Sequence, residues 1–210
     1  MNRRNFVRNT ALVAGVITLL PAVGSLQSRL EGRLHPLFID LGRIRIHDIL
    51  KSPSAMPYLM RRVKDNLLGM QTIALGDSQA IFRPKQWDDF SRQAIHISHS
   101  SMIHSKADLW YDEVLLHHAI HSLRLKIQPI YVSLSNTEIA HSNPQKYLQL
   151  LHKLDKQIAG QLDRWVADGQ EVHIFSSGGR NMHANDHGGY DHSAEDEHAC
   201  RIFHFYTKTT

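Results

Sequence analysis

The sequence has a single cysteine and lacks long apolar runs beyond its first 24 residues. Cys200 has no partner for an internal disulfide, so packing or a bound metal must stabilise the fold. Internal repeats and low-complexity segments are absent, which argues against solenoid and fibrous architectures. The apolar run at residues 11–20 is too short to span a bilayer comfortably. We therefore expect no stable membrane span in the processed chain.

A strong excess of either charge is also missing. The formal net charge of +4 includes the arginines among the first eight residues, and without them the balance is close to neutral. Such a balance gives no reason to expect a nucleic-acid partner. Histidine, by contrast, is abundant, with 16 residues. This abundance favours metal binding, pH sensitivity or both.

The first residues carry the pattern of an export signal. Arg3 and Arg4, followed by Phe6, match the twin-arginine motif, and an apolar run comes directly after them. Small residues up to Gly24 offer a cleavage point. We predict that residues 1–24 are a signal read by the twin-arginine export machinery, with an uncleaved anchor as the alternative. Residues 25–210 would then be a single periplasmic or otherwise exported domain, since a chain of this length can bury one core.

A strand, a long helix and a second strand follow one another in the later part of the sequence. Residues 130–134 and 171–175 have the length and composition of buried strands. Asn143 is placed to cap a helix at Pro144, and an apolar face recurs every three or four residues up to Ala167. About 24 helical residues span roughly 36 Å, enough for a crossover. We predict two parallel, neighbouring strands in an α/β domain, whose mainly parallel sheet is flanked by helices.

Side chains that bind metals and anions follow both predicted strands. The carboxyl ends of parallel strands are where such sheets place their ligand sites. Carboxylate and imidazole suit a zinc-like ion, whereas guanidinium and amide groups suit phosphate or sulfate oxygens. For any single residue, a solvated polar loop is the simpler explanation. Together the two loops predict a metal-assisted site for a small anionic ester, and their candidate residues are Glu138, His141, Arg180, Asn181, His183, Asp186, His187, Asp191 and His192.

The remaining segments are expected to support this unit. Residues 37–40 read as a short strand ending in Asp40, which is placed either to bind a metal or substrate or to cap a turn. Helical spacing predicts packing helices over residues 56–68 and 108–125, and residues 199–206 read as a terminal strand. Residues 71–105 show no clear periodicity. His117 and His121 share one helix face and could chelate a metal, although a solvated face explains them as well.

Several of these segments together resemble a known family. The resemblance is to the carboxyl-terminal half of the alkaline phosphatase/sulfatase superfamily, and in particular to its exported, sulfatase-like members. It extends from about residue 130 to residue 203 and is weak over residues 37–59. The segments that carry it are Thr137-Glu138-Ile139-Ala140-His141-Ser142-Asn143, Leu154-Asp155, Gly179-Arg180-Asn181, Tyr190-Asp191-His192-Ser193 and Arg201-Ile202-Phe203.

The resemblance implies a metal-dependent phosphoric or sulfuric ester hydrolase. In the superfamily a sheet flanked by helices holds two divalent ions, usually zinc, beside a Ser, Thr or formylglycine-type nucleophile. Glu138 and His141 match an acid–histidine ligand pair, and His192 matches a late histidine of the same metal site. Asp191 is the expected fourth ligand or the acid that orients an imidazole, and Asp40 resembles an aspartate of the other metal site. Arg180, beside Asn181, would steady the anion.

The sequence also departs from the superfamily pattern. Ser177 and Gly178 stand where an acid and a histidine of the second metal site are expected. Thr72 and Ser78 are only formal candidates for the nucleophile. Two hypotheses follow: an exported metal-dependent ester hydrolase, or a non-catalytic member that binds a metal or an anionic ligand.

Overall fold

The structure is a computed structural model, and it describes residues 34–98, 110–123, 128–193 and 195–208. Within these residues the chain forms a six-stranded sheet with the order β2-β6-β5-β1-β4-β3. The strands are β1 (Leu37–Asp40), β2 (Leu68–Ala74), β3 (Ile95–Ser98), β4 (Ile130–Ser133), β5 (Val172–Phe175) and β6 (Arg201–Thr207). The helices are α2 (Ile46–Leu50), α3 (Pro57–Lys64), α4 (Trp87–Phe90), α5 (Trp110–Leu123) and α6 (Pro144–Ala167), with the 3-10 helices η2 (Asn136–His141) and η3 (Glu197–Cys200).

The sheet is mixed but mostly parallel, which confirms the predicted α/β class. Strands β3, β4, β1 and β5 run parallel to one another. The terminal strand β6 is antiparallel both to β5 and to β2, which forms the edge. All four residues of β1 and of β5 are buried. Strands buried on both faces belong in the middle of a sheet, and that is where these two lie.

The two strands joined by α6 are parallel members of one sheet, but the prediction that they are neighbours is wrong. β1 lies between them, with Leu37 paired to Ile130 on one side and to Val172 on the other. The fully apolar start of β1 explains the difference, because a central position buries both of its faces. Helix α6 therefore carries the chain across β1. As a result, the loops after β4 and β5 leave the sheet on either side of the end of β1.

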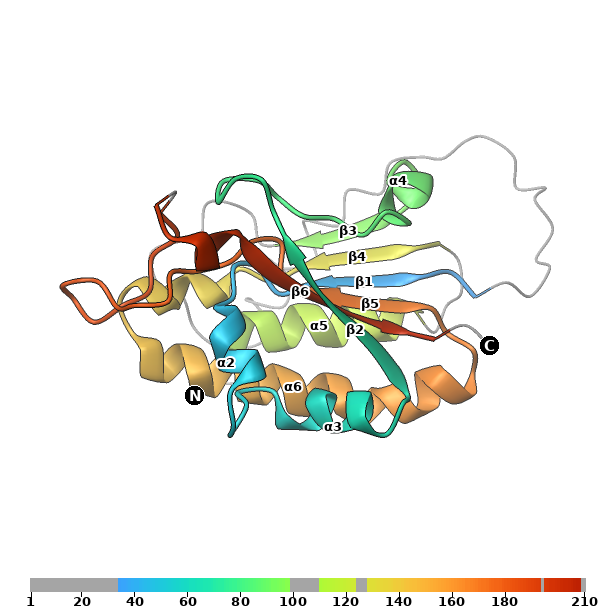
Figure 1. Ribbon diagram of the computed structural model, residues 1–210. Coiled ribbons are helices and arrows are strands. Elements are labelled where there is room, and N and C mark those ends of the chain that lie inside the picture. Colours follow the sequence, from blue (N-terminus) through green and yellow to red (C-terminus); the bar gives the residue numbers. More distant parts are fainter. Residues whose placement is uncertain (1–33, 99–109, 124–127, 194, 209–210) are drawn as a thin grey trace, which may run out of the picture.

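Helix α6 is one continuous helix of 24 residues, as predicted. The Asn143 side chain accepts a hydrogen bond from the Lys146 N–H at 3.0 Å, which satisfies an unpaired donor of the first turn. The buried face of α6, which includes Leu151, Leu154 and Ile158, packs in the main core. Figure 1 shows α3, α5 and α6 together on one side of the sheet.

Helix α3 is shorter than predicted and is capped by α6. The predicted helix over residues 56–68 ends at Lys64, because Asn66 adopts a positive φ of 62° and turns the chain. Leu68 then begins β2. The buried Asp155 carboxylate of α6 accepts hydrogen bonds from the backbone N–H groups of Tyr58 and Leu59, each at 2.8 Å. This carboxylate therefore fixes the start of α3 against α6.

The opposite face of the sheet carries aromatic and histidine side chains. Trp87 of α4 packs edge-on against Phe38, with ring centroids 5.4 Å apart, and lies 4.6 Å from the ring of Tyr131. His173 of β5 and His204 of β6 are also buried on this face. The segment around α4, for which the sequence showed no clear periodicity, thus covers this side of β1 and β4.

The two buried histidines belong to a hydrogen-bonded row that crosses three strands. Gln71 Nε2 lies 2.9 Å from His204 Nδ1, and His204 Nε2 lies 2.9 Å from His173 Nδ1. His173 Nε2 in turn lies 2.9 Å from the Glu171 carboxylate. Neutral imidazoles satisfy all three bonds when each residue donates to the next, from Gln71 to Glu171. The row therefore links the edge strand β2 to the centre of the sheet.

The predicted export signal, residues 1–24, lies outside the described residues, and so do two histidines of the segment without clear periodicity, His99 and His104. The described part of the predicted helix over residues 108–125 is α5. No helix in the described ranges is long and apolar enough to cross a membrane.

Candidate metal centre

Glu138 and His141 are brought together by the 3-10 helix η2, which closely follows β4. A 3-10 helix has three residues per turn, so side chains at i and i+3 lie directly above one another. Glu138 Oε2 is accordingly 3.1 Å from His141 Nε2. The start of η2 is held by Asp112 of α5, whose carboxylate accepts hydrogen bonds from the Ser135 N–H at 3.2 Å and the Asn136 N–H at 3.0 Å.

His192 reaches the same place from the loop after β5. Its ring centroid lies 5.2 Å from that of His141. One carboxylate oxygen of Glu138 and one ring nitrogen from each histidine all lie within 4.8 Å of one another. Glu138 is exposed and the two histidines are partly buried. The structure therefore brings these three predicted site residues together at the end of the sheet, where the loops after β4 and β5 gather at the left in Figure 1.

Asp191 lies behind His141. Its Oδ1 is 2.7 Å from His141 Nδ1, and its Oδ2 accepts a hydrogen bond from Asn185 Nδ2 at 3.1 Å. The hydrogen bond from His141 lowers the pKa of Asp191. With Nδ1–H directed at Asp191, the lone pair of His141 Nε2 faces the Glu138 carboxylate. An imidazole nitrogen and a carboxylate oxygen are both ligands of zinc-like ions, so the donor set fits a divalent metal ion, and the Arg180 guanidinium supplies positive charge beside both groups.

Close backbone packing holds Asp191 in this position. Gly189 passes directly over the carbonyl of His141, and a Cβ at this position would lie 1.8 Å from that oxygen. The next residue, Tyr190, donates its N–H to the Ala140 carbonyl at 2.8 Å. Any side chain at position 189 would therefore push the Asp191 loop away from η2.

Arg180 is fully buried beside the three residues, and its contacts differ from those predicted. Its guanidinium donates to three backbone carbonyls: those of Arg43 at 2.9 Å, Thr137 at 2.9 Å and Tyr190 at 2.8 Å. It also lies 3.2 Å from His141 Nε2 and 3.1 Å from Glu138 Oε1. These five contacts equal the five N–H groups of a guanidinium. The geometry therefore favours a role in joining the loops over direct contact with an anion.

Asn181 also connects two parts of the site. Its side-chain oxygen accepts the Ser193 N–H at 2.8 Å, and its Nδ2 donates to Ser193 Oγ at 3.0 Å. Ser193 directly follows His192. Asn181 thus positions the loop that carries this histidine, and within the described residues no contact with Glu138 or His141 is seen.

Asp40 lies at the end of β1, as predicted, but the structure does not bring it into the group of three. One carboxylate oxygen accepts the Gly42 N–H at 2.8 Å and the other accepts the Tyr131 hydroxyl at 2.8 Å. Burial raises the pKa of Asp40, and these hydrogen bonds oppose that shift. The turn-capping role that the sequence left open describes these contacts.

The positions expected to serve a second metal are occupied differently. At Gly178, a Cβ would lie 2.7 Å from Arg43 Nη1, so the Arg43 guanidinium fills the space that a side chain at this position would need. Thr72 is exposed in β2. Ser78 is fully buried, and its Oγ has no hydrogen-bond partner among the described residues.

Arg43 is a residue that our sequence reasoning missed. It follows Asp40 by three residues, so the strand-end rule that selected Asp40 could also have selected it. Its Nη1 donates to the Ser78 carbonyl at 2.6 Å. Burial lowers the pKa of His192, and the positive charge of Arg43 adds to that effect. Arg43 is therefore a positive charge close enough to His192 to act on it electrostatically.

A cavity of about 430 Å³ adjoins Ser193, the residue that follows His192. Its lining carries three acidic side chains, Glu195, Asp196 and Glu197, and two histidines, His183 and His198. The Asp196 carboxylate is committed to the backbone N–H groups of Met182 and His198.

The histidine pair on α5 and the histidine on β3 lie away from the three candidate ligands. His117 and His121 are exposed on α5, and neither belongs to a group of three possible ligands among the described residues. His96 is exposed on β3. A solvated helix face, the alternative left open for His117 and His121, agrees with this placement.

Comparisons with known proteins support the fold. A scan against protein-family models and a search of curated proteins found no match. Among solved structures, the chain is similar to the C-terminal periplasmic domain of EcEptC from Escherichia coli in complex with Zn, with a TM-score of 0.54 and 13% identity. A second structure of that domain gives a TM-score of 0.52 and 12% identity. Both alignments cover 82% of this chain and 72% of that one. The likeness shows an alkaline phosphatase-like α/β fold.

Proposed function

We propose that this protein is an exported, zinc-binding member of the alkaline phosphatase/sulfatase superfamily that hydrolyses phosphate or sulfate esters. The observation that carries the proposal is the convergence of Glu138, His141 and His192 from two strand ends, with their donor atoms within 4.8 Å of one another. Two further observations support it. The fold is alkaline phosphatase-like, and a similar domain, from the periplasm, was solved in complex with Zn.

Glu138, His141 and His192 would hold the ion, and three protein ligands leave a coordination position open, as in catalytic zinc sites. Zinc bound in this way acts as a Lewis acid on an ester oxygen and lowers the pKa of a bound water to about 7. A zinc ion would compete with Arg180 for one atom of Glu138 and one of His141, because the guanidinium contacts both residues. The three carbonyl contacts of Arg180 do not depend on these two atoms.

The neighbouring residues hold the ligands in place. Asp191 keeps the proton of His141 on Nδ1 and so directs Nε2 towards Glu138. Asn181 ties down the residue next to His192, and Arg180 joins the chain segments at residues 43, 137 and 190. Ligands fixed in this way lose little conformational freedom when an ion binds.

A non-catalytic role is the second candidate, and a specific observation favours it. Ser177 and Gly178 replace the second pair of expected metal ligands, and the Ser78 hydroxyl is fully buried. A protein with this site would bind a metal or an anionic ligand without a side-chain nucleophile at hand. Hydrolysis of aryl phosphate and aryl sulfate esters by the zinc-loaded protein separates the two candidates, because the non-catalytic protein would bind zinc and leave both esters intact.

Zinc titration of three histidine variants tests the site itself. We expect His141→Ala and His192→Ala each to lower zinc affinity by at least about tenfold, because each removes a ligand. His121→Ala is the matched control, since His121 is exposed on α5, and it should bind zinc like the parent. Isothermal titration calorimetry measures all three affinities. Equal zinc affinity in all three variants and the parent would rule out this metal centre.

A further inference from the structure

Arg43 is a half-buried arginine without an acidic partner among the described residues. Among the described residues its guanidinium donates one hydrogen bond, from Nη1 to the Ser78 carbonyl at 2.6 Å, and this acceptor is neutral. A partly buried charge normally needs an opposite charge or several hydrogen bonds to offset its lost hydration. The remaining N–H groups of Arg43 are therefore available to a ligand that carries negative charge.

The other two arginines near the site are each held by several protein contacts. Arg45 pairs with Asp48, donates to the Met182 carbonyl at 2.9 Å and stacks over the ring of Tyr190 at 3.8 Å. Arg180 has five protein contacts, which is the number of N–H groups it carries. Neither guanidinium can turn to a ligand without losing bonds that hold the loops. Among the described residues, Arg43 has the fewest side-chain hydrogen bonds of the three.

The surroundings of Arg43 place it at the candidate centre. Its guanidinium lies over Gly178, at the start of the loop that carries His192. Gln79, next to Ser78, directs its Nε2 towards the His192 carbonyl at 3.4 Å. The backbone carbonyl of Arg43 accepts from Arg180, which itself contacts Glu138 and His141.

We propose that Arg43 is the anion-binding residue of this site and that its guanidinium takes the oxygens of a phosphate or sulfate group. The inference rests on the proposed function and adds a residue to it. A planar guanidinium fork matches two oxygens of a tetrahedral oxyanion. Gly178 is part of the arrangement, because a Cβ at this position would lie 2.7 Å from Nη1 and would displace the fork.

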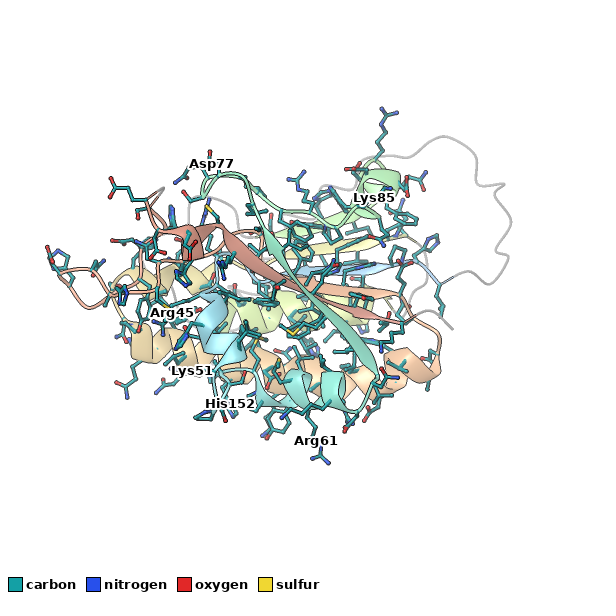
Figure 2. All side chains as sticks on the ribbon, viewed as in Figure 1. Arg45, Lys51, Arg61, Asp77, Lys85 and His152 are labelled. Atoms are coloured by element: carbon teal, nitrogen blue, oxygen red, sulfur yellow. The ribbon has the colours of Figure 1, made fainter. Side chains whose placement is uncertain are left out.

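Anion titration of four variants tests the inference. Arg43→Gln removes the charge and should weaken sulfate binding about 10- to 100-fold, the range expected when a charged hydrogen bond is lost. Gly178→Ala keeps the charge but moves the fork and should also weaken binding, whereas Arg43→Lys should retain part of the affinity. Arg61→Gln is the matched control, because Arg61 is an exposed arginine on α3, at the opposite side of the molecule from Asp77 in Figure 2. Calorimetry with inorganic sulfate, with and without zinc, and with inorganic phosphate without zinc, gives the affinities.

The outcomes separate this inference from the metal proposal. Sulfate affinity that falls with Arg43→Gln and stays unchanged with Arg61→Gln supports the inference, whether or not the parent binds zinc. Equal losses in these two variants, an unchanged Arg43→Gln, or a parent that binds neither anion would overturn it. Zinc binding that depends on His141 and His192 is judged independently of these titrations. If circular dichroism shows that Arg43→Gln does not fold, the sulfate affinities of Arg43→Lys and Gly178→Ala test the inference instead. Unchanged sulfate affinity in both variants would overturn it.

Discussion

Arg43 and Arg180 illustrate what individual side chains do around the candidate centre. Arg180 is fully buried and donates to the carbonyls of three chain segments. The guanidinium of the half-buried Arg43 donates one hydrogen bond among the described residues. The same residue type thus organises the loops in one place and remains open to a ligand in the other. Residue type and strand-end position selected Arg180 from the sequence, but only the contacts distinguish its role from that of Arg43.

Replacing Arg180 should destabilise the fold strongly. Arg180→Met keeps most of the buried volume and leaves the carbonyls of Arg43, Thr137 and Tyr190 without their donor. We expect a loss of about 3 to 5 kcal/mol in the free energy of unfolding, as for other broken buried charge networks. Urea denaturation measures this loss. Arg164→Met, at a mostly exposed position in α6, should cost less than about 1 kcal/mol. Similar losses in the two variants would show that Arg180 does not hold the loops.

The candidate site could be predicted in part from single residues. Glu138, His141 and His192 were selected because they follow buried strands and match a family pattern, and the structure brings their donor atoms within 4.8 Å. For Asp40 the sequence left a ligand role and a turn-capping role open, and Arg43 was not selected at all. Whether a strand-end side chain bonds its own turn or faces a ligand depends on contacts such as that between Asp40 and Tyr131. Contacts of this kind join residues far apart in the chain, so local spacing does not reveal them.

At the scale of elements, a buried carboxylate of α6 fixes the position of the first turn of α3. Asp155 accepts two backbone N–H groups from the first turn of α3, so Asp155→Ala should lower the free energy of unfolding by about 2 kcal/mol. Asp163→Ala is the matched control on the same helix. Its exposed ion pair with Arg62, at 2.6 Å, should contribute less than about 1 kcal/mol. Thermal or urea denaturation at neutral pH compares them, and an Asp155 variant no less stable than the Asp163 variant would refute the capping role.

The row of histidines across β5 and β6 predicts a loss of stability in mild acid. Burial lowers the pKa of His204 to about 3, well below the ordinary value of 6.5. Below pH 6.5 the unfolded chain therefore binds a proton that the folded chain excludes, so stability falls as the pH drops from about 6.5 towards 3. Between pH 7 and pH 5 this group should account for a loss of about 2 kcal/mol. His204→Gln removes the group that titrates.

Urea denaturation of the parent and of His204→Gln at the two pH values isolates this effect. The parent should lose more stability on acidification than the variant, while His96→Gln, an exposed position on β3, should behave like the parent. Burial raises the pKa of Asp155 to about 6, which acts in the opposite direction, but Asp155 is present in all three proteins and cancels in the comparison. Equal pH dependence of the parent and His204→Gln would contradict the prediction.

The secondary structure was predictable wherever a periodic pattern and a local signal agreed. α6 has both an apolar face and an Asn143-Pro144 start, and its predicted bounds match. The end of α3 was missed because Leu67 and Leu68 continue the helical spacing, whereas the left-handed Asn66 ends the helix. Strand order was missed for a different reason. Sequence shows that a crossover joins two parallel strands, but not that a third strand fits between them.

At the scale of the whole molecule, the expected export route gives a direct test. The similar domain of EcEptC is periplasmic, and this sequence begins with the Arg3-Arg4 pattern. Replacing both arginines with lysine should leave the protein in the cytoplasm, because a receptor reads the arginine pair. Cell fractionation followed by immunoblotting measures the distribution. An unchanged exported fraction would rule out the twin-arginine route, and a single Arg8→Lys variant controls for the loss of arginine near the signal.

The first strand of the sheet leaves the ribosome long before either of its neighbours. Leu37 of β1 pairs with Ile130 of β4 and with Val172 of β5, and both partners are synthesised much later than Leu37. Closing such long loops costs chain entropy before the new contacts repay it, so the centre of the sheet forms slowly compared with its helices. The loop between β5 and β6, which carries His192, is fixed at both ends only after β6 pairs with β5. We therefore expect Glu138, His141 and His192 to come together late in folding, although the first two are synthesised well before the chain ends.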